Sequence, residues 1–348
     1  MGLRNIALGA AALGVAALAW AAGGPALADS GSFGAWSVVC DNARVCTAFG
    51  FGELGEIGSS GFLRVTRGAG PADAPVIDLV TAGTAATSLA LAVDGVTPRG
   101  LAAVPATPID TDPERRLTQL TPTQSAALLA VLAKGSDLTL KEGRNPATTI
   151  SLTGSSAALR FMDDRQKRAG TMTALVARGS TPASSVPAPP ALPKVTAAPA
   201  AAQTGLPSQP SAALQARLGA CDDDIADLGI KPDVARLAPG KLFWGVVCSR
   251  GAYNVIYSLF LTDEAGGDVE ALQVPYANGE PVTELMNIDF DPETQTLTNF
   301  DKGRGLGDCG ALSRWVWTGQ AFALTHQTLM PDCQGVTSDY WPVSYRTR

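Results

Sequence analysis

The sequence contains a single histidine among its 348 residues, and this scarcity excludes several chemistries. A Ser-His-Asp site would depend on His326, and no G-x-S-x-G motif is present to support one. No C-x-x-C occurs, so a thioredoxin-like exchange site lacks its usual spacing. One histidine and paired cysteines leave no zinc ligand set. We therefore predict no metal and no cofactor, and we expect His326 on the polar side of a strand.

Basic residues are also in short supply, with 26 lysines and arginines against 32 acidic residues and a net charge of −6. The acidic excess lies from Ala212 onward. Such a surface repels phosphate backbones, so nucleic acid is not an expected partner. Beyond the first residues, no run of 18 or more apolar residues occurs. The mature chain is therefore not expected to span a membrane.

Residues 1–28 have the pattern of an export signal. Arg4 precedes an apolar run from Ile6 to Ala22, and Ala26-Leu27-Ala28 fits the small-x-small cleavage pattern, which leaves Asp29 as the mature N-terminus. A membrane anchor is the alternative, but glycines and a proline cut the run short. We expect a protein of the periplasm or the exterior of the cell.

The cysteine count fits that location. All six cysteines lie in the mature part, and exported proteins with an even number usually form disulfides. Six cysteines can pair in many ways, and proximity along the chain favours Cys40–Cys46, Cys221–Cys248 and Cys309–Cys333.

Residues 180–211 divide the mature chain. This Pro/Ala-rich segment has one charge and no aromatic residue, so it offers little surface to bury and its prolines oppose helix and sheet pairing. We predict a disordered linker between an N-terminal domain, residues 29–179, and an acidic C-terminal domain, residues 212–348.

Both domains are predicted to be β-rich. In the first, strands are expected at 36–40, 76–80 and 88–93. One helix starts at Thr121 with a capping box to Gln124. A second runs from Ser155 to Arg168, and its i,i+4 charge pairs Asp163–Lys167 and Asp164–Arg168 indicate a solvated face.

In the second domain, apolar residues recur at helical spacing over 214–228, and the rest alternates like strands separated by turns. Turns are expected at Asp291-Pro292-Glu293-Thr294 and at Thr318-Gly319. The fold class is therefore mainly β (α+β), with two sandwich-like domains and a few short helices joined by the linker.

The stretch "FDKGRGLGDCG", residues 300–310, formally contains G-x-G-x-x-G. A dinucleotide site needs that motif to open a helix, whereas strand-like residues follow here. The glycines are better explained by positive φ and close backbone approach around a disulfide at Cys309. Lys302 and Arg304 retain the potential to meet an anion.

Two acidic stretches resemble calcium loops only partly. Residues 289–300 lack the glycine at position six and the glutamate at position twelve, and a hairpin turn explains them better. Residues 221–229 offer carboxylates without the ligand pattern. Aromatic side chains suggest a recognition groove, although the core is their commoner location. The candidate binding residues are Tyr253, Asn254, Lys302, Arg304, Asp308 and Trp315. Trp317, Tyr340 and Trp341 are further candidates for the same groove.

Several segments together carry a family resemblance. "FGAWSVVCDNARVC", "GAYN", "KGRGLGDCG", "WVWTG" and "DYWPVSYR" resemble, in the same order, exported proteobacterial proteins that share domain of unknown function 1176. The N-terminal part alone is also similar to the invasion-associated locus B family. The first family has no assigned activity, so the resemblance implies an envelope location and a β-rich fold but no catalytic residues. The second adds a link to host-cell invasion.

We therefore expect a non-enzymatic, disulfide-stapled accessory or binding protein that recognises an envelope component or another protein. One alternative is an envelope hydrolase of glycan or peptide, which requires two acids facing one deep cleft with one of them desolvated. A third hypothesis is an inhibitor that inserts the loop from Gly303 to Gly310 into a foreign active site.

Overall fold

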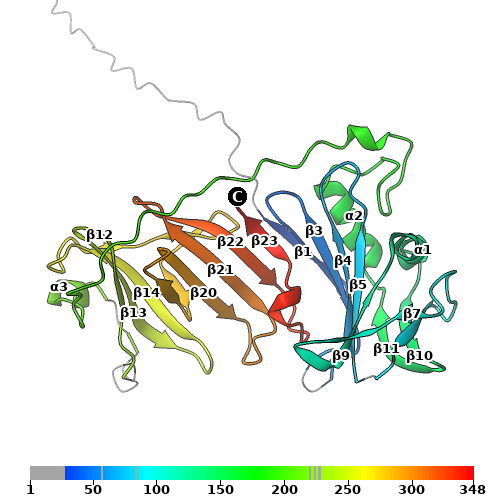
Figure 1. The fold of residues 1–348 in the computed structure, drawn as a ribbon, viewed down its shortest axis with the longest axis horizontal. Helices are drawn as coiled ribbons and strands as arrows, with labels where there is room; N and C mark the ends of the chain where they lie inside the picture. Colours follow the sequence, from blue (N-terminus) through cyan, green and yellow to red (C-terminus); the bar gives the residue numbers. More distant parts are fainter. Residues whose placement is uncertain (1–27, 56–57, 84, 219–220, 223–224, 226–228) are drawn as a thin grey trace, which may run out of the picture.

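The fold is described from a computed structural model, which covers residues 28–55, 58–83, 85–218, 221–222, 225 and 229–348. The predicted signal, residues 1–28, lies almost entirely outside the described residues. Two β-rich halves lie side by side, and the C-terminal strand of the second half adjoins the first (Figure 1). Within the described part of the chain, no helix has the length and apolar character needed to cross a membrane.

The first half contains two antiparallel sheets. The larger has the order β1-β2-β3-β4-β5-β9-β8 and the smaller β11-β10-β6-β7. One hydrophobic cluster draws side chains from both sheets and from the helices, which makes a sandwich-like core. The strands are β1 (Asp29–Phe33), β2 (Trp36–Cys40), β3 (Cys46–Phe51), β4 (Gly61–Arg67), β5 (Val76–Ala82), β6 (Ser88–Val93), β7 (Val104–Pro105), β8 (Thr107–Ile109), β9 (Asp112–Gln119), β10 (Asp137–Glu142) and β11 (Asn145–Ser151).

Helix α1 (Pro122–Leu132) begins as predicted. Thr121 is its N-cap, and the capping box with Gln124 is complete, because each residue's side chain accepts a hydrogen bond from the other's backbone N–H. The start of α1 is therefore set by residues next to it in the sequence.

Helix α2 (Ser155–Arg165) corrects the prediction for its end. The helix stops before Lys167, whose φ of 57° is left-handed. Asp163 and Arg168 are not on a solvated face: both are fully buried. Asp163 accepts hydrogen bonds from the backbone N–H groups of Leu175 and Val176, so a returning loop, rather than solvent, surrounds it.

The second half packs two five-stranded sheets around a second cluster, again sandwich-like. The predicted turns at 291–294 and 318–319 do connect antiparallel neighbours. Of the helix predicted over 214–228, only α3 (Ala212–Gln215) is observed, and much of the remainder lies outside the described residues. The strands are β12 (Asp233–Ala238), β13 (Lys241–Arg250), β14 (Val255–Thr262), β15 (Glu270–Ala271), β16 (Val274–Pro275), β17 (Pro281–Val282), β18 (Glu284–Met286), β19 (Asp289–Asp291), β20 (Thr296–Lys302), β21 (Gly310–Trp317), β22 (Phe322–Met330) and β23 (Val343–Arg346).

The two halves share a hydrophobic cluster of their own. Phe49 and Phe62 from the first half pack with Met330, Val336 and Trp341 from the second. Polar contacts reinforce this junction: the Asn42 side chain donates to the backbone oxygen of Arg346 and accepts from its N–H, at 2.9 and 3.0 Å. The halves are therefore joined by packing as well as by the chain.

The segment 180–211, which we call the strap, runs in an extended path from α2 to α3 along one side of both halves (Figure 1). Its only described helical turn is the 3-10 helix η1 (Ala183–Ser185). The sequence predicts a disordered linker here, whereas in the structure the strap makes specific contacts. Gln203 exchanges two hydrogen bonds with the Arg236 backbone, and Ala198 N–H donates to Trp317 oxygen at 2.7 Å. The edge of β12 supplied partners that composition does not reveal.

Candidate functional site

The glycine-rich corner between β20 and β21 is a tightly constrained loop. We call residues Gly303–Asp308 the Cys309 loop. The Gly303 N–H donates to Cys309 oxygen at 2.9 Å, and Gly307 N–H donates to Arg304 oxygen at 2.9 Å. A Cβ on Gly303 would lie 2.6 Å from Cys309 Sγ, so glycine is required there by close approach to the disulfide. Because this G-x-G-x-x-G match leads into a strand, the prediction of a stapled turn is confirmed.

An ion pair closes the loop on itself. Arg304 donates through Nε and Nη2 to the two carboxylate oxygens of Asp308, at 2.7 and 2.6 Å. The same carboxylate accepts the N–H of Gly335 at 2.6 Å, which ties the loop to the segment after Cys333. Burial alone raises the pKa of Asp308, but these hydrogen bonds outweigh it and hold that pKa below its ordinary value. Arg304 is therefore occupied within the molecule rather than free for an anion.

A polar brace supports the loop from the β13–β14 hairpin. The Tyr253 hydroxyl donates to Gly303 oxygen at 3.3 Å, and Asn254 Nδ2 donates to Lys302 oxygen at 2.9 Å. Asn287, which the sequence did not single out, donates through Nδ2 to Asn254 Oδ1, at 2.8 Å. Asn287 has a left-handed φ of 47°, a conformation that asparagine adopts more readily than most residues, but nothing in the sequence marks this asparagine out.

The outer surface of the loop is apolar. Leu306 is 58% exposed and Tyr253 is 43% exposed, whereas Asp308 beneath them is buried. The Tyr253 ring lies against the loop, since a Cβ on Gly305 would meet it at 3.4 Å. Two large side chains are thus presented to solvent by a backbone that several hydrogen bonds and a disulfide fix in place.

Of the six candidate binding residues, the structure gathers five around this loop and separates the sixth. Tyr253, Asn254, Lys302, Arg304 and Asp308 lie on or beside it. Trp315 is fully buried in the second core, and its indole N–H donates to Pro275 oxygen at 2.6 Å. Trp315 and Trp317 are buried on the inner side of β21 and do not share a groove with Tyr253.

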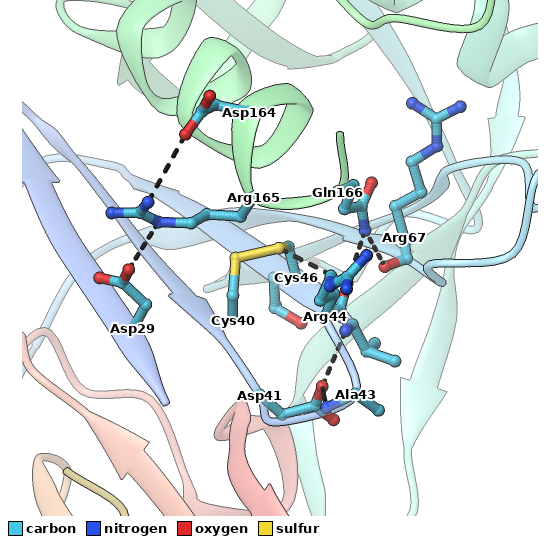
Figure 2. The surroundings of a disulfide bond; sticks show 12 residues. Asp29, Cys40, Asp41, Ala43, Arg44, Cys46, Arg67, Asp164, Arg165 and Gln166 are labelled. Atoms are coloured by element: carbon cyan, nitrogen blue, oxygen red, sulfur yellow. Dashed lines mark hydrogen bonds and ion pairs between the residues drawn. A yellow bond between two sulfur atoms is a disulfide. The ribbon is translucent and has the colours of Figure 1, made fainter. Parts of the chain in front are cut away.

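The six cysteines form the three predicted pairs, Cys40–Cys46, Cys221–Cys248 and Cys309–Cys333. The first closes the β2–β3 hairpin beside Asp41, whose carboxylate accepts the N–H groups of Ala43 and Val45 (Figure 2). The Gln166 side chain donates to Arg44 oxygen and Arg67 oxygen next to this hairpin. That disulfide therefore fixes a loop that contacts both α2 and the second half.

A second feature is an acidic cleft of about 390 Å³ between β14, β16–β18 and β20. Asp301 is its most buried acid, and it accepts a hydrogen bond of 2.5 Å from the Tyr276 hydroxyl. Burial raises the pKa of Asp301, while hydrogen bonds from Tyr276 and Asn299 partly offset that effect. Glu280 and Glu284 also line the cleft but are exposed.

The structure also shows where the other candidate sites lie. His326 is exposed on β22, on the polar side as expected. Residues 289–291 and 296–302 form the predicted hairpin. Across the described ranges, no three metal-ligating side chains gather into a cluster.

Comparison with known proteins agrees with the resemblance seen in the sequence. The profile of the family described as "Protein of unknown function (DUF1176)" matches residues 30–348. The Escherichia coli (strain K12) protein YpfG, itself described as uncharacterised, is 31% identical over 344 residues, which cover 91% of this chain and 92% of YpfG.

Among solved structures, invasion associated protein B from Bartonella henselae is similar over 40% of this chain and 98% of its own, with 19% identity and a TM-score of 0.28. A similarity of that size transfers neither fold nor function. The match to the family profile, by contrast, covers residues 30–348 in one continuous range. The chain therefore belongs to the DUF1176 family of proteins of unknown function.

Proposed function

We propose that the protein is a non-enzymatic, extracytoplasmic binding protein and that the Cys309 loop is its recognition element. The observation that carries this proposal is the contrast within the loop. Its base is held by a disulfide, a bidentate ion pair and the Asn254 brace, while Leu306 and Tyr253 are exposed.

This arrangement favours association because the entropy of ordering a loop is already lost before a partner arrives. Immobilising one flexible side chain on binding costs about 0.5 to 1.5 kcal/mol, and ordering a free loop adds to that cost. Tyrosine is one of the residue types enriched among the positions that dominate interface energies, and the neighbouring Leu306 adds exposed apolar surface on the same fixed backbone. We infer a protein partner with an apolar pocket that receives Leu306.

Two further observations support the proposed extracytoplasmic location. Three disulfides in one chain are typical of an oxidising compartment, and the first 28 residues have the pattern of an export signal. An envelope component or another exported protein is therefore the expected partner.

Affinity capture from periplasmic extract tests the proposal. Wild type is compared with Leu306→Asp, and Met172→Asp serves as the matched control because Met172 is 57% exposed in the first half. A retained protein should be lost with Leu306→Asp and kept with Met172→Asp. Equal retention by all three proteins would refute the role of the loop. If the retained protein is an enzyme whose activity falls on binding, the inhibitor hypothesis replaces the accessory role.

Hydrolysis is a second candidate function, favoured by the acidic cleft. Asp301 is desolvated and has two other acids in the same cleft, which is part of what an acid–base pair requires. Incubation with cell-wall glycan and with denatured protein, followed by measurement of soluble fragments, separates the two functions. The binding proposal expects no fragments. Fragment release that is lost in Asp301→Asn would establish the hydrolase instead.

A further inference from the structure

A second surface feature lies far along the second half from the Cys309 loop. It is a groove of about 830 Å³ beneath the strap. One wall consists of strap residues 198–202, the other of the β12–β13 turn around Pro239, and Trp317 and Gly319 lie at its end. Most of these residues are alanine, proline or glycine, whose small side chains permit close approach of another backbone.

Trp317 lines this groove and carries a donor without a partner among the described residues. Its side chain is fully buried, yet its indole Nε1–H has no hydrogen-bond partner among the described residues. A buried donor without a partner costs more free energy than an ordinary hydrogen bond returns. An oxygen atom supplied by a ligand in the groove would satisfy it.

The charges around the groove indicate what kind of group supplies this oxygen. Arg236 is fully engaged, because it pairs with Glu264 at 2.6 and 2.9 Å and donates to two strap carbonyls, those of Ala202 and Thr204. Lys241 does not line the groove itself, but it lies beside a residue that does: its Nζ is 5.7 Å from the Trp317 ring centroid, and among the described residues no ion pair involves it. The remaining charge is therefore positive, which complements a carboxylate in an otherwise acidic half.

The contacts of the strap show which kind of chain packs against this surface. Ala198 packs against the cluster that contains Trp317, and its N–H donates to Trp317 oxygen. The groove follows the strap from Ala198 to Thr204, which corresponds to roughly 20 Å of extended chain. We propose that the groove binds an extended peptide of small apolar residues that ends in a free carboxylate, with the carboxylate at Trp317 and Lys241.

A peptide titration tests this directly. The probe is an acetylated pentapeptide, Ala-Pro-Ala-Ala-Ala with a free carboxylate, and its C-terminal amide is the matched ligand. Calorimetry on the full mature protein should show binding of the acid, and about tenfold weaker binding of the amide, since one charge-assisted hydrogen bond is lost. Equal affinities, or no binding of the acid at millimolar concentration, would overturn the proposal.

Variants locate the site. Lys241→Gln should weaken the acid about tenfold, while Lys141→Gln, a lysine on β10 in the first half, should leave it unchanged. In ¹⁵N-labelled wild type, the indole resonance that disappears in Trp317→Phe should shift during the titration. If this resonance does not move while the peptide binds, Trp317 is excluded from the site. Leu306→Asp should not alter peptide binding, so the groove and the Cys309 loop succeed or fail separately.

Discussion

At the scale of single residues, Asp308 determines the geometry of the Cys309 loop. It is buried, and its two oxygens receive Arg304 from within the loop and Gly335 from across the disulfide. A similar polar anchor is Asp163, which sequence spacing placed on a solvated helix face and the structure buries. In both cases a carboxylate orders backbone N–H groups that would otherwise be unpaired.

Asp308→Asn should lower the free energy of unfolding by about 1 to 3 kcal/mol at pH 7, because a charge-assisted pair is lost. Since the folded pKa of Asp308 is depressed, its contribution is present above the unfolded pKa, about 3.9, and is lost as the pH falls through the folded value. Urea unfolding of both proteins at pH 7 and near pH 2 measures this. A difference in stability that is the same at both pH values would contradict the assignment.

At the scale of elements, the strap and the disulfides are local segments held by distant partners. Apart from an isolated bridge between Thr181 and Thr171, the strap forms no strand, yet Gln203 mimics a neighbouring strand by exchanging two hydrogen bonds with Arg236 on β12. The Cys309–Cys333 bond joins the loop before β21 to the loop before η3 (Ser338–Tyr340).

Gln203→Ala should release the strap from β12. Without the two hydrogen bonds, residues near 203 should be cut several-fold faster by proteinase K, because cleavage requires local opening. Gln209→Ala is the control, since Gln209 is an exposed glutamine in the same strap. Mass spectrometry of the early fragments locates the cuts, and equal rates for the two variants would mean that Gln203 does not hold the strap.

The Cys309–Cys333 disulfide should contribute about 3 to 4 kcal/mol, as expected from the chain entropy lost on closing a loop of 24 residues. Replacing both cysteines by alanine should lower the unfolding free energy by that amount and weaken partner capture, because the Cys309 loop loses its base. Thiol titration of the unreduced native protein should find no free thiol. A free thiol at Cys309 would instead support a redox or nucleophilic role for this residue.

At the scale of the whole molecule, the two halves behave as one packed body. The cluster around Trp341 and the Asn42–Arg346 hydrogen bonds link the β2–β3 hairpin, which Cys40–Cys46 closes, to the C-terminal strand β23. The Cys309 loop lies close to this junction, because Gln334, adjacent to Gly335, accepts hydrogen bonds from Ser59 of the first half.

Asn42→Ala should therefore weaken contact between the halves. Two partly buried hydrogen bonds are lost, and we expect a loss of about 1 to 3 kcal/mol with faster amide hydrogen exchange in β23. Asn145→Ala, at an exposed position on β11, should have neither effect. Unchanged exchange in β23 would show that the hydrophobic cluster alone holds the halves together.

Much of the local structure could be read from the sequence because its causes are local. The capping box of α1, the hairpin turns at 291–294 and 318–319, and the strand at Trp36–Cys40 each depend on residues a few positions apart. The glycines around Cys309 indicated a stapled turn for the same reason, and proximity along the chain sufficed to pair the cysteines.

Tertiary structure alone decided which side chains meet across the chain. It buried Asp163 and Trp315, placed Asn287 beneath Asn254, and set the strap against β12. Burial and hydrogen-bond pairing between distant segments depend on how the sheets stack, and no short-range pattern encodes that. The sequence by itself determined the strands, turns and cross-links, while packing between distant segments of the second half and the strap brought together the brace and the groove.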